Sequence, residues 1–318
     1  MGKLCKECLI DSNIIKRIND IKSLIDLSNR IKFSNDIDLV SLWKISPYLK
    51  EIDKMVGFEN VKKSLVYQIL YYIQGLKSPN DYLHVMIYGQ PGSGKTTLAI
   101  LISKIYTRLN ILKNDKLIFG KRDDFIAGYL GQTAQKTTNF LNSCIGSVLF
   151  IDEIYSIGID TDDKDSFAKE ALNTLNAFLS ENRNNFCCIG AGYKEDIENN
   201  FFKINKGLKR RFQWIFEIDT PDVDNKIAIF RYMFLKNEWQ LDVSDKFLKN
   251  LLRDYIELFE FGGGSIETFI TKCKMSYSVR IFGTNIKNKK ITEEDVINTI
   301  QTFYSENKME KAYNMMYM

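Results

Sequence analysis

The segment that most constrains this chain fits the phosphate-binding pattern G-x-x-x-x-G-K-[ST] at every fixed position and reads Gly89-Gln90-Pro91-Gly92-Ser93-Gly94-Lys95-Thr96. An apolar run at 85–88 precedes this phosphate loop, and a helical pattern at 97–108, opening on Thr97, follows it. A strand, a loop without bulky side chains and a helix N-terminus direct several backbone N–H groups at one anion. A glycine-rich turn is the alternative, but the flanking strand and helix favour a nucleotide site.

Two side chains of this loop, and two that follow a later apolar run, predict specific chemistry. Lys95 supplies a positive charge for the terminal phosphates, and the Thr96 hydroxyl can hold a magnesium ion. Asp152 and Glu153 directly follow an apolar run at 148–151, so one carboxylate can face the metal and the other an attacking water. Alone, two acids after a strand would indicate a solvated turn. Together with the phosphate loop they predict a magnesium ligand, Asp152, and a catalytic residue, Glu153.

Apolar and helical patterns alternate along the middle of the chain. Strand-like runs occur at 85–88, 116–119, 148–151, 186–189 and 214–218. Such alternation predicts a parallel sheet with helices on both faces. After Thr220-Pro221 the strand signals stop, and helical patterns at 222–236, 244–257, 265–282 and 292–304 predict a small all-helical domain. We therefore expect three parts: a helical extension (1–44), a nucleotide-binding α/β domain (45–220) and a helical lid domain (221–318).

The extension carries one recognisable pattern. Ile14, Ile18, Ile21 and Ile25 recur at helical spacing with charged residues between them, which predicts an amphipathic helix. This helix would pack on the body of the protein or on a partner. Ser46-Pro47 is expected to break the helical pattern, because proline disfavours a helical residue before it.

Composition narrows the cellular setting. The 318 residues are 45% hydrophobic, and no apolar run approaches the length of a membrane span or a signal peptide, so we expect a soluble, cytoplasmic protein without a membrane partner. The 44 basic and 40 acidic residues leave a charge of +4, too small to favour a nucleic-acid partner.

The cysteines do not predict a zinc site. Cys5 and Cys8 have a metal-like spacing, but the chain has one histidine and no second such cysteine pair. Cys187 and Cys188 lie in an apolar run, where cysteine behaves as a small hydrophobe.

From about residue 52 to residue 303 the chain resembles the AAA+ ATPases, through Met55-Val56-Gly57, the phosphate loop, Asp152-Glu153 and the 207–212 segment. Within that superfamily it looks most like the branch of the red-type Rubisco activases and the sporulation stage V protein K. That similarity is carried by Ala191-Gly192-Tyr193 and by the segment Asp124-Phe125-Ile126-Ala127-Gly128-Tyr129-Leu130-Gly131-Gln132-Thr133. Related ATPases of large DNA viruses look similar around 261–264 and 266–268.

The resemblance implies an α/β AAA+ phosphate-loop NTPase with a five-stranded parallel sheet between helices and a small helical lid domain. It also implies a ring of identical chains, usually a hexamer, that binds ATP and Mg²⁺ at each interface. Arg211 aligns with the family's arginine finger, and Arg210 is a possible substitute. Val56 and Gly57 match the segment that packs on the adenine.

The resemblance further implies that Tyr129-Leu130-Gly131 line a central pore and grip an unfolded peptide; burial of Tyr129 in a core is the alternative. Two positions depart from many relatives. Tyr193 stands where a polar sensor such as asparagine is common, although the same branch usually has tyrosine there. The lid region Gly263-Gly264-Ser265-Ile266-Glu267 has no sensor arginine, which puts the coupling of nucleotide state to the lid in question.

Three functions compete at this point. The leading one is an ATP-hydrolysing ring motor that remodels or disassembles a protein or peptide substrate through its pore. A nucleic-acid motor or loader is the second; the modest charge and the aromatic pore loop count against it. The third is a nucleotide-gated scaffold that binds ATP without hydrolysing it.

Overall fold

The structure is a computed structural model that describes residues 18–30, 39–129, 131–158, 166–259, 263–285 and 288–302. The chain divides into two compact units. The first comprises Met1–Gly89 and Gly94–Asp219, and the second comprises Thr220–Met318 together with Gln90–Ser93 of the phosphate loop. Within the described ranges, no helix has both the length and the apolar character that crossing a bilayer requires.

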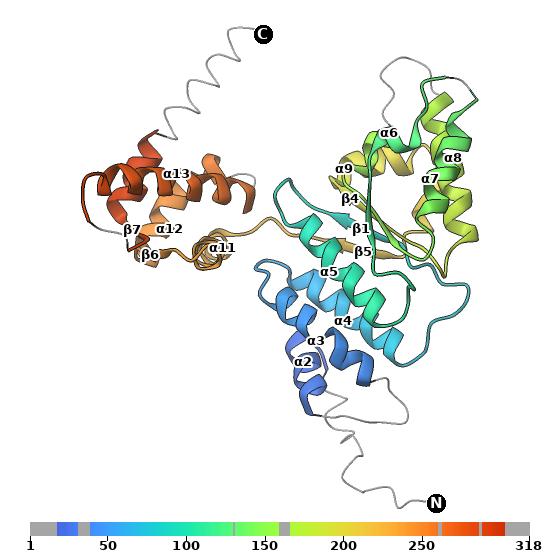
Figure 1. Ribbon diagram of the computed structural model, residues 1–318, viewed down its shortest axis with the longest axis horizontal. Helices are drawn as coiled ribbons and strands as arrows, with labels where there is room; N and C mark the ends of the chain where they lie inside the picture. Colours follow the sequence, from blue (N-terminus) through green and yellow to red (C-terminus); the bar gives the residue numbers. More distant parts are fainter. Residues whose placement is uncertain are drawn as a thin grey trace, which may run out of the picture. The chain divides into compact units, whose positions relative to one another are not determined.

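A five-stranded parallel sheet forms the centre of the first unit, as predicted (Figure 1). Its strands have the spatial order β2-β3-β4-β1-β5, with bounds β1 Val85–Tyr88, β2 Leu117–Gly120, β3 Val148–Ile151, β4 Cys187–Gly192 and β5 Trp214–Glu217. Because all five strands run in the same direction, their carboxyl ends lie at one edge. Two strand spacings, about 10 Å, separate β1 from β3 across β4.

Helices cover both faces of this sheet (Figure 1). Val85 and Ile87 point to the face covered by α2 Ile21–Arg30, α3 Leu39–Asp53, α4 Glu59–Ile73 and α5 Lys95–Arg108. Met86 and Tyr88 point to the other face, covered by α7 Thr133–Ser143 and α8 Ser166–Glu181. Both faces of β1 and β3 are buried, which explains the continuous apolar runs in the sequence.

Short helices connect these strands and the longer helices. Their bounds are α6 Arg122–Phe125, η2 Ile154–Ile157, α9 Lys194–Ile197, the π-helix η3 Glu198–Phe202 and α10 Lys206–Lys209. They follow β2, β3 and β4, so the segments that carry the predicted site residues leave the sheet on short, irregular connections.

The amphipathic helix of the extension is α2, which packs on the body of the protein. Ile21, Leu24 and Leu27 are buried in the same core as α3 and α4. The helix begins after Asp20, whose carboxylate accepts a hydrogen bond from the Ser23 N–H at 2.8 Å. Ile14 lies outside the described residues.

The predicted break at Ser46-Pro47 is wrong, because Pro47 lies inside the continuous helix α3. Leu42, Ile45, Leu49 and Ile52 on the inner face of α3 are all fully buried. Burial of these four side chains outweighs the roughly 3 kcal/mol cost of an interior proline. Helix α3 also crosses the expected boundary between residues 44 and 45.

The second unit has its own hydrophobic core. It contains α11 Val223–Lys236, α12 Asp245–Asp254, η4 Ile256–Phe259, α13 Gly263–Ile281 and a helix from 293, all near the predicted positions. The all-helical expectation is wrong, however, since β6 Gln240–Asp242 and β7 Lys290–Thr292 form a two-stranded parallel sheet. Leu241 pairs with Ile291, and strands of three residues are too short to show alternation in the sequence.

Candidate nucleotide-binding and catalytic site

The phosphate loop leaves β1 at the carboxyl edge of the sheet. The Gly89 N–H donates to the Gly192 carbonyl oxygen at 3.1 Å, which extends the pairing of β1 with β4. Gly94 caps α5 with a φ of +92°, and a Cβ there would lie 3.3 Å from the Phe58 ring. Glycine is therefore required at this position both for the backbone angle and for the close approach. The loop delivers the N-terminus of α5 to this edge.

The Ser93 hydroxyl gives a direct indication that this loop accepts a ligand. Its oxygen is buried and has no hydrogen-bond partner among the described residues. A buried hydroxyl without a partner costs about 1–3 kcal/mol. A phosphate oxygen bound in the loop would satisfy this group, so the loop fits an anion.

Lys95 is the first residue of α5 and folds back over the loop. Its half-buried Nζ donates to the Gly89 carbonyl oxygen at 3.1 Å. Burial lowers the pKa of Lys95, and the charges of Asp152 and Glu153 oppose that shift. Lysine and both carboxylates thus interact electrostatically across the strand ends. Next in the helix, Thr96 is half-buried and Thr97 is exposed.

Asp152 and Glu153 follow β3 and are both exposed. Glu153 has a φ of +49°, in the left-handed region that residues other than glycine rarely adopt. Its N–H donates to Asp152 Oδ1 at 3.1 Å, and the next turn begins η2. Backbone strain of this kind costs about 1–3 kcal/mol and concentrates at functional sites. The backbone therefore turns at Glu153, directly after Asp152, in a conformation of the kind found at functional sites.

Tyr193 lies near Lys95, directly after β4. Its ring centroid is 6.0 Å from Lys95 Nζ and 6.3 Å from the centroid of the Tyr155 ring. Burial, followed by the charges of Glu153 and Asp196, raises the pKa of Tyr193. Its phenol therefore stays protonated at neutral pH and can donate a hydrogen bond.

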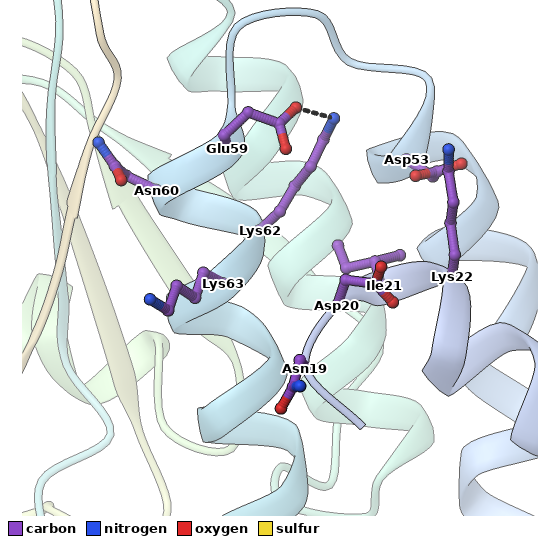
Figure 2. A pocket seen from close by; sticks show the side chains of 9 residues that line it. All are labelled: Asn19, Asp20, Ile21, Lys22, Asp53, Glu59, Asn60, Lys62 and Lys63. Carbon is purple, nitrogen blue, oxygen red and sulfur yellow. Dashed lines mark hydrogen bonds and ion pairs between the residues drawn. The ribbon is translucent and has the colours of Figure 1, made fainter. Parts of the chain in front are cut away.

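The predicted adenine segment packs beside the loop. Val56 and Gly57 are half-buried, and Gly57 has a φ of +80°. A pocket of about 400 Å³ opens next to this segment, between the start of α2, the end of α3 and the start of α4 (Figure 2). Among the described residues that line this pocket, three lysines balance three carboxylates: Lys22, Lys62 and Lys63, and Asp20, Asp53 and Glu59. Lys62 and Glu59 form an ion pair at 2.9 Å. A balanced lining of this kind favours neither an anionic nor a cationic ligand.

The two candidate finger residues have different surroundings. Arg211 Nε donates to the Ser180 hydroxyl at 3.0 Å, and its Nη1 donates to the Gly207 carbonyl oxygen at 2.8 Å. Arg210, at the end of α10, is exposed. The two hydrogen bonds use two of the five N–H donors of Arg211 and fix the guanidinium direction. Ser180, on α8, was not anticipated, since nothing in the sequence links it to a residue 31 positions away.

The predicted pore loop follows α6. Tyr129 is 75% exposed, which contradicts the alternative that it is a core residue. Gly131 has a φ of +79°, and Leu130 lies outside the described residues. The Thr133 hydroxyl accepts a hydrogen bond from the Ala127 N–H at 3.2 Å and so ties the base of the loop to α7. The aromatic side chain therefore stands in solvent on an anchored loop.

The sequence of this chain is similar to those of known proteins. The family model described as "ATPase family associated with various cellular activities (AAA)" matches residues 85–220. A cfxQ-like protein of Acanthamoeba polyphaga mimivirus is 32% identical over 96% of this chain and 78% of its own length. Stage V sporulation protein K of Bacillus subtilis is 37% identical over 65% of this chain and 66% of its own length.

A third relative is named for its protein target. The chloroplastic ribulose bisphosphate carboxylase/oxygenase activase of Cyanidioschyzon merolae is 29% identical over 84% of this chain and 87% of its own. Among solved structures, the Holliday junction branch migration motor RuvB of Thermotoga maritima has a TM-score of 0.56 at 20% identity, over 79% of this chain and 71% of that one. At that identity the RuvB likeness shows the fold alone. The relatives agree with the branch that the sequence motifs indicate.

Proposed function

Since this chain belongs to the AAA family of ATPases, we propose that it is an ATP-hydrolysing ring motor that remodels or disassembles a protein substrate through a central pore. One observation carries the hydrolytic part. Lys95 at the phosphate loop interacts with Asp152 and Glu153 at the end of β3, and the backbone of Glu153 adopts a strained, left-handed turn. A phosphate loop facing two strand-end carboxylates, one of them on a strained turn, supports phosphoryl transfer to water.

The residues fit ATP and Mg²⁺. Backbone N–H groups of the loop and the unpaired Ser93 hydroxyl would hold the phosphates, and Val56 and Gly57 would pack on the adenine. Thr96 and Asp152 supply the hard oxygen ligands that Mg²⁺ prefers, with phosphate oxygens completing the set. When bound, the ion would neutralise charge on the transferring phosphate.

Each remaining residue has a separate role. The Glu153 carboxylate would orient an attacking water and accept its proton, and Lys95 would stabilise the terminal phosphates. Arg211 of a neighbouring chain would stabilise the charge that develops on the transferring phosphoryl group, with exposed Arg210 as the alternative. Ser180 and the Gly207 carbonyl would position that guanidinium. Because the finger and the phosphate loop would come from different chains, a complete site would need two.

The pore loop supports a protein substrate. Arg122 of α6 donates to the carbonyl oxygen of Ser156 at 2.5 Å, in the helix η2 that follows Glu153. The element that leads to Tyr129 is thus tied to the segment that carries the catalytic glutamate. An exposed aromatic on an anchored loop can hold a peptide through apolar contact, without reading its sequence. The activase relative, named for action on another protein, supports the same class of substrate.

A Glu153→Gln variant tests this function. The variant keeps the size of the side chain and loses the carboxylate that would accept the proton of water. ATP should therefore still bind while turnover falls at least about a hundredfold. Glu195→Gln, an exposed carboxamide substitution on α9, is the matched control and should leave turnover unchanged. Turnover is measured over a range of protein concentrations, with and without a chemically unfolded polypeptide. An ATP-bound Glu153→Gln ring should also retain that polypeptide.

The other functional classes predict different results. Stimulation by single-stranded DNA, decreasing steeply with salt and absent with polypeptide, would assign the chain to nucleic-acid motors. ATP binding without turnover, at concentrations where rings form, would identify a scaffold. Unchanged turnover in Glu153→Gln would reject the catalytic assignment.

A further inference from the structure

The outer face of α3 carries an apolar stripe that no described residue covers. Val40, Trp43 and Pro47 are exposed at spacings of three and four, which places them on one side of the helix. Trp43 is 65% exposed, whereas Trp214 and Trp239 both pack against tyrosine rings at the edges of the cores. An exposed tryptophan on a rigid helix is uncommon and marks interaction surfaces.

A pocket of about 400 Å³ lies beside this stripe, bounded by α2, α3 and the end of α5. We call it the α3 basic pocket, and its lining is Asn29, Trp43, Lys44, Ser46, Pro47, Lys50 and Arg108. Every ionisable residue in this lining is a cation. Lys44 and Lys50 make no ion pair within the described part of the chain. Asp115 lies 3.6 Å from Arg108, but it also pairs with Lys104, so two cations share one carboxylate.

The α3 basic pocket contrasts with the balanced pocket beside the adenine segment. There three carboxylates face three lysines, whereas among the described residues no carboxylate lines the α3 basic pocket. An excess of one sign next to an apolar stripe is complementary to an acidic segment that also carries a large apolar side chain. Arginine and tryptophan are the side chains that contribute most to such interfaces.

We propose that the α3 basic pocket and the stripe of Val40, Trp43 and Pro47 form a docking site for an acidic peptide segment of a partner protein. An apolar side chain of that segment packs on Trp43, and its carboxylates lie against Lys44, Lys50 and Arg108. A peptide is favoured over single-stranded nucleic acid, because base stacking uses several aromatic platforms in succession and Trp43 is the one aromatic among the described residues of this lining. This recruitment site is separate from the pore loop.

The position of the site also separates it from catalysis. Lys95 begins α5 at the phosphate loop, and Arg108 ends the same helix about 20 Å away, at 1.5 Å per residue. Residues of the docking site therefore have no part in binding nucleotide. Its test does not depend on ATP hydrolysis.

The experiment measures peptide binding by the full chain. The probe is a fluorescein-labelled peptide with the sequence Asp-Asp-Glu-Leu-Phe-Asp-Glu, followed by fluorescence anisotropy. Two comparison peptides replace the acids by lysine or the Leu-Phe pair by Ser-Gly. The acidic apolar peptide is expected to bind at least about tenfold more tightly than either comparison peptide.

Surface variants locate the site. Trp43→Ala and the double variant Lys44→Glu/Lys50→Glu should each weaken binding of the probe at least about tenfold. The matched controls are Tyr67→Ala, another exposed aromatic at 53%, and Lys63→Glu from the balanced pocket. Both controls should bind the probe as the unsubstituted chain does. Thermal unfolding of each variant verifies that the fold is retained.

Three outcomes would overturn the proposal. Equal binding of all three peptides, or equal binding of the probe by all variants, would show that this surface is not a docking site for an acidic peptide. Tighter binding of an oligothymidylate at the same residues assigns the surface to nucleic acid. Self-association that Trp43→Ala abolishes, without peptide binding, assigns it to a second copy of the chain. ATP turnover without peptide is measured on the same samples, so a failure of the ATPase proposal is seen separately from a failure of the docking site.

Discussion

The phosphate-loop edge of the sheet is built differently from a second group of segments, the connections that carry Arg211 and Tyr129. Lys95, Asp152 and Glu153 follow buried strands directly, and the chain's own backbone fixes their positions. Arg211 follows the short helix α10 and is half-buried against Ser180 and the Gly207 carbonyl, whereas Tyr129 is exposed on the loop after α6. The first region can bind its ligand within one chain. The second has groups whose role, in our proposal, requires another chain or a substrate.

This difference predicts an order of effects. Changes at the strand ends should impair the nucleotide site of the chain that carries them. A change at Arg211 should instead be repaired by an intact neighbouring chain, and a change at Tyr129 should appear only with substrate present.

Lys95→Ala is expected to have the largest effect. The substitution removes the charge next to the terminal phosphates, so ATP binding should weaken and turnover should fall by about a thousandfold or more. Lys104→Ala is the control, because Lys104 lies two to three turns further along α5 and forms an exposed ion pair with Asp115. This variant should change neither ATP binding nor turnover. Isothermal titration with ATP and a phosphate-release assay measure the two quantities. Equal losses in both variants would contradict the assignment.

Arg211→Ala is expected to lower turnover about a thousandfold while leaving ATP binding intact, because in our proposal Arg211 acts on the transition state of a neighbouring site. Arg210→Ala should lower it less than about tenfold if Arg211 is the finger. Ser180→Ala removes one hydrogen bond that positions Arg211 and should cost about tenfold in turnover, with rescue by Ser180→Thr. The reverse order of the two arginine variants would transfer the finger role to Arg210.

A mixing experiment tests whether the finger acts between chains. Lys95→Ala chains lack a binding site but carry Arg211, and Arg211→Ala chains carry a site but lack the finger. In an equal mixture of the two inactive variants, about one quarter of the interfaces would combine an intact site with an intact finger. Turnover should therefore reappear on mixing. No recovery, with rings confirmed by light scattering, would place the finger within its own chain.

The strand-end region was predictable because its signals are local. The phosphate loop, the apolar runs around it and the acids after β3 each occupy fewer than ten neighbouring residues, and all five strands formed close to the expected positions. The same reasoning failed where distant packing decides the outcome. Helix α3 continues through Pro47 because its other side chains are buried against α2, α4 and α5.

Two other features had no usable signal in the sequence. Strands β6 and β7 pair residues that are 50 positions apart, Leu241 with Ile291, and three residues cannot display a period of two. The contact of Arg211 with Ser180 likewise joins two separate segments. The motif around Arg211 therefore predicted a candidate role, but not the serine that holds its side chain.

Asp152→Asn is expected to have a smaller effect than the lysine and arginine variants. The substitution replaces one carboxylate oxygen by an amide nitrogen and removes the negative charge. It should therefore weaken a magnesium ligand while leaving the phosphate loop in place. The Mg²⁺ concentration for half-maximal turnover should rise about tenfold, and saturating Mg²⁺ should restore most of the rate. Asp123→Asn, an exposed position on α6, is the control. An unchanged Mg²⁺ requirement in Asp152→Asn would remove the residue from the metal site.

Tyr129→Ala is expected to have the smallest effect on basal turnover, within about twofold, because the side chain is exposed. Its effect should appear with substrate: an unfolded polypeptide should no longer stimulate turnover, whereas Tyr129→Phe should retain stimulation through the aromatic ring. Tyr67→Ala controls for loss of an exposed tyrosine elsewhere. Full stimulation in Tyr129→Ala would move substrate contact away from this loop. Loss of basal turnover would instead indicate that Arg122, which ties α6 to the segment after Glu153, transmits changes from the loop to the catalytic glutamate.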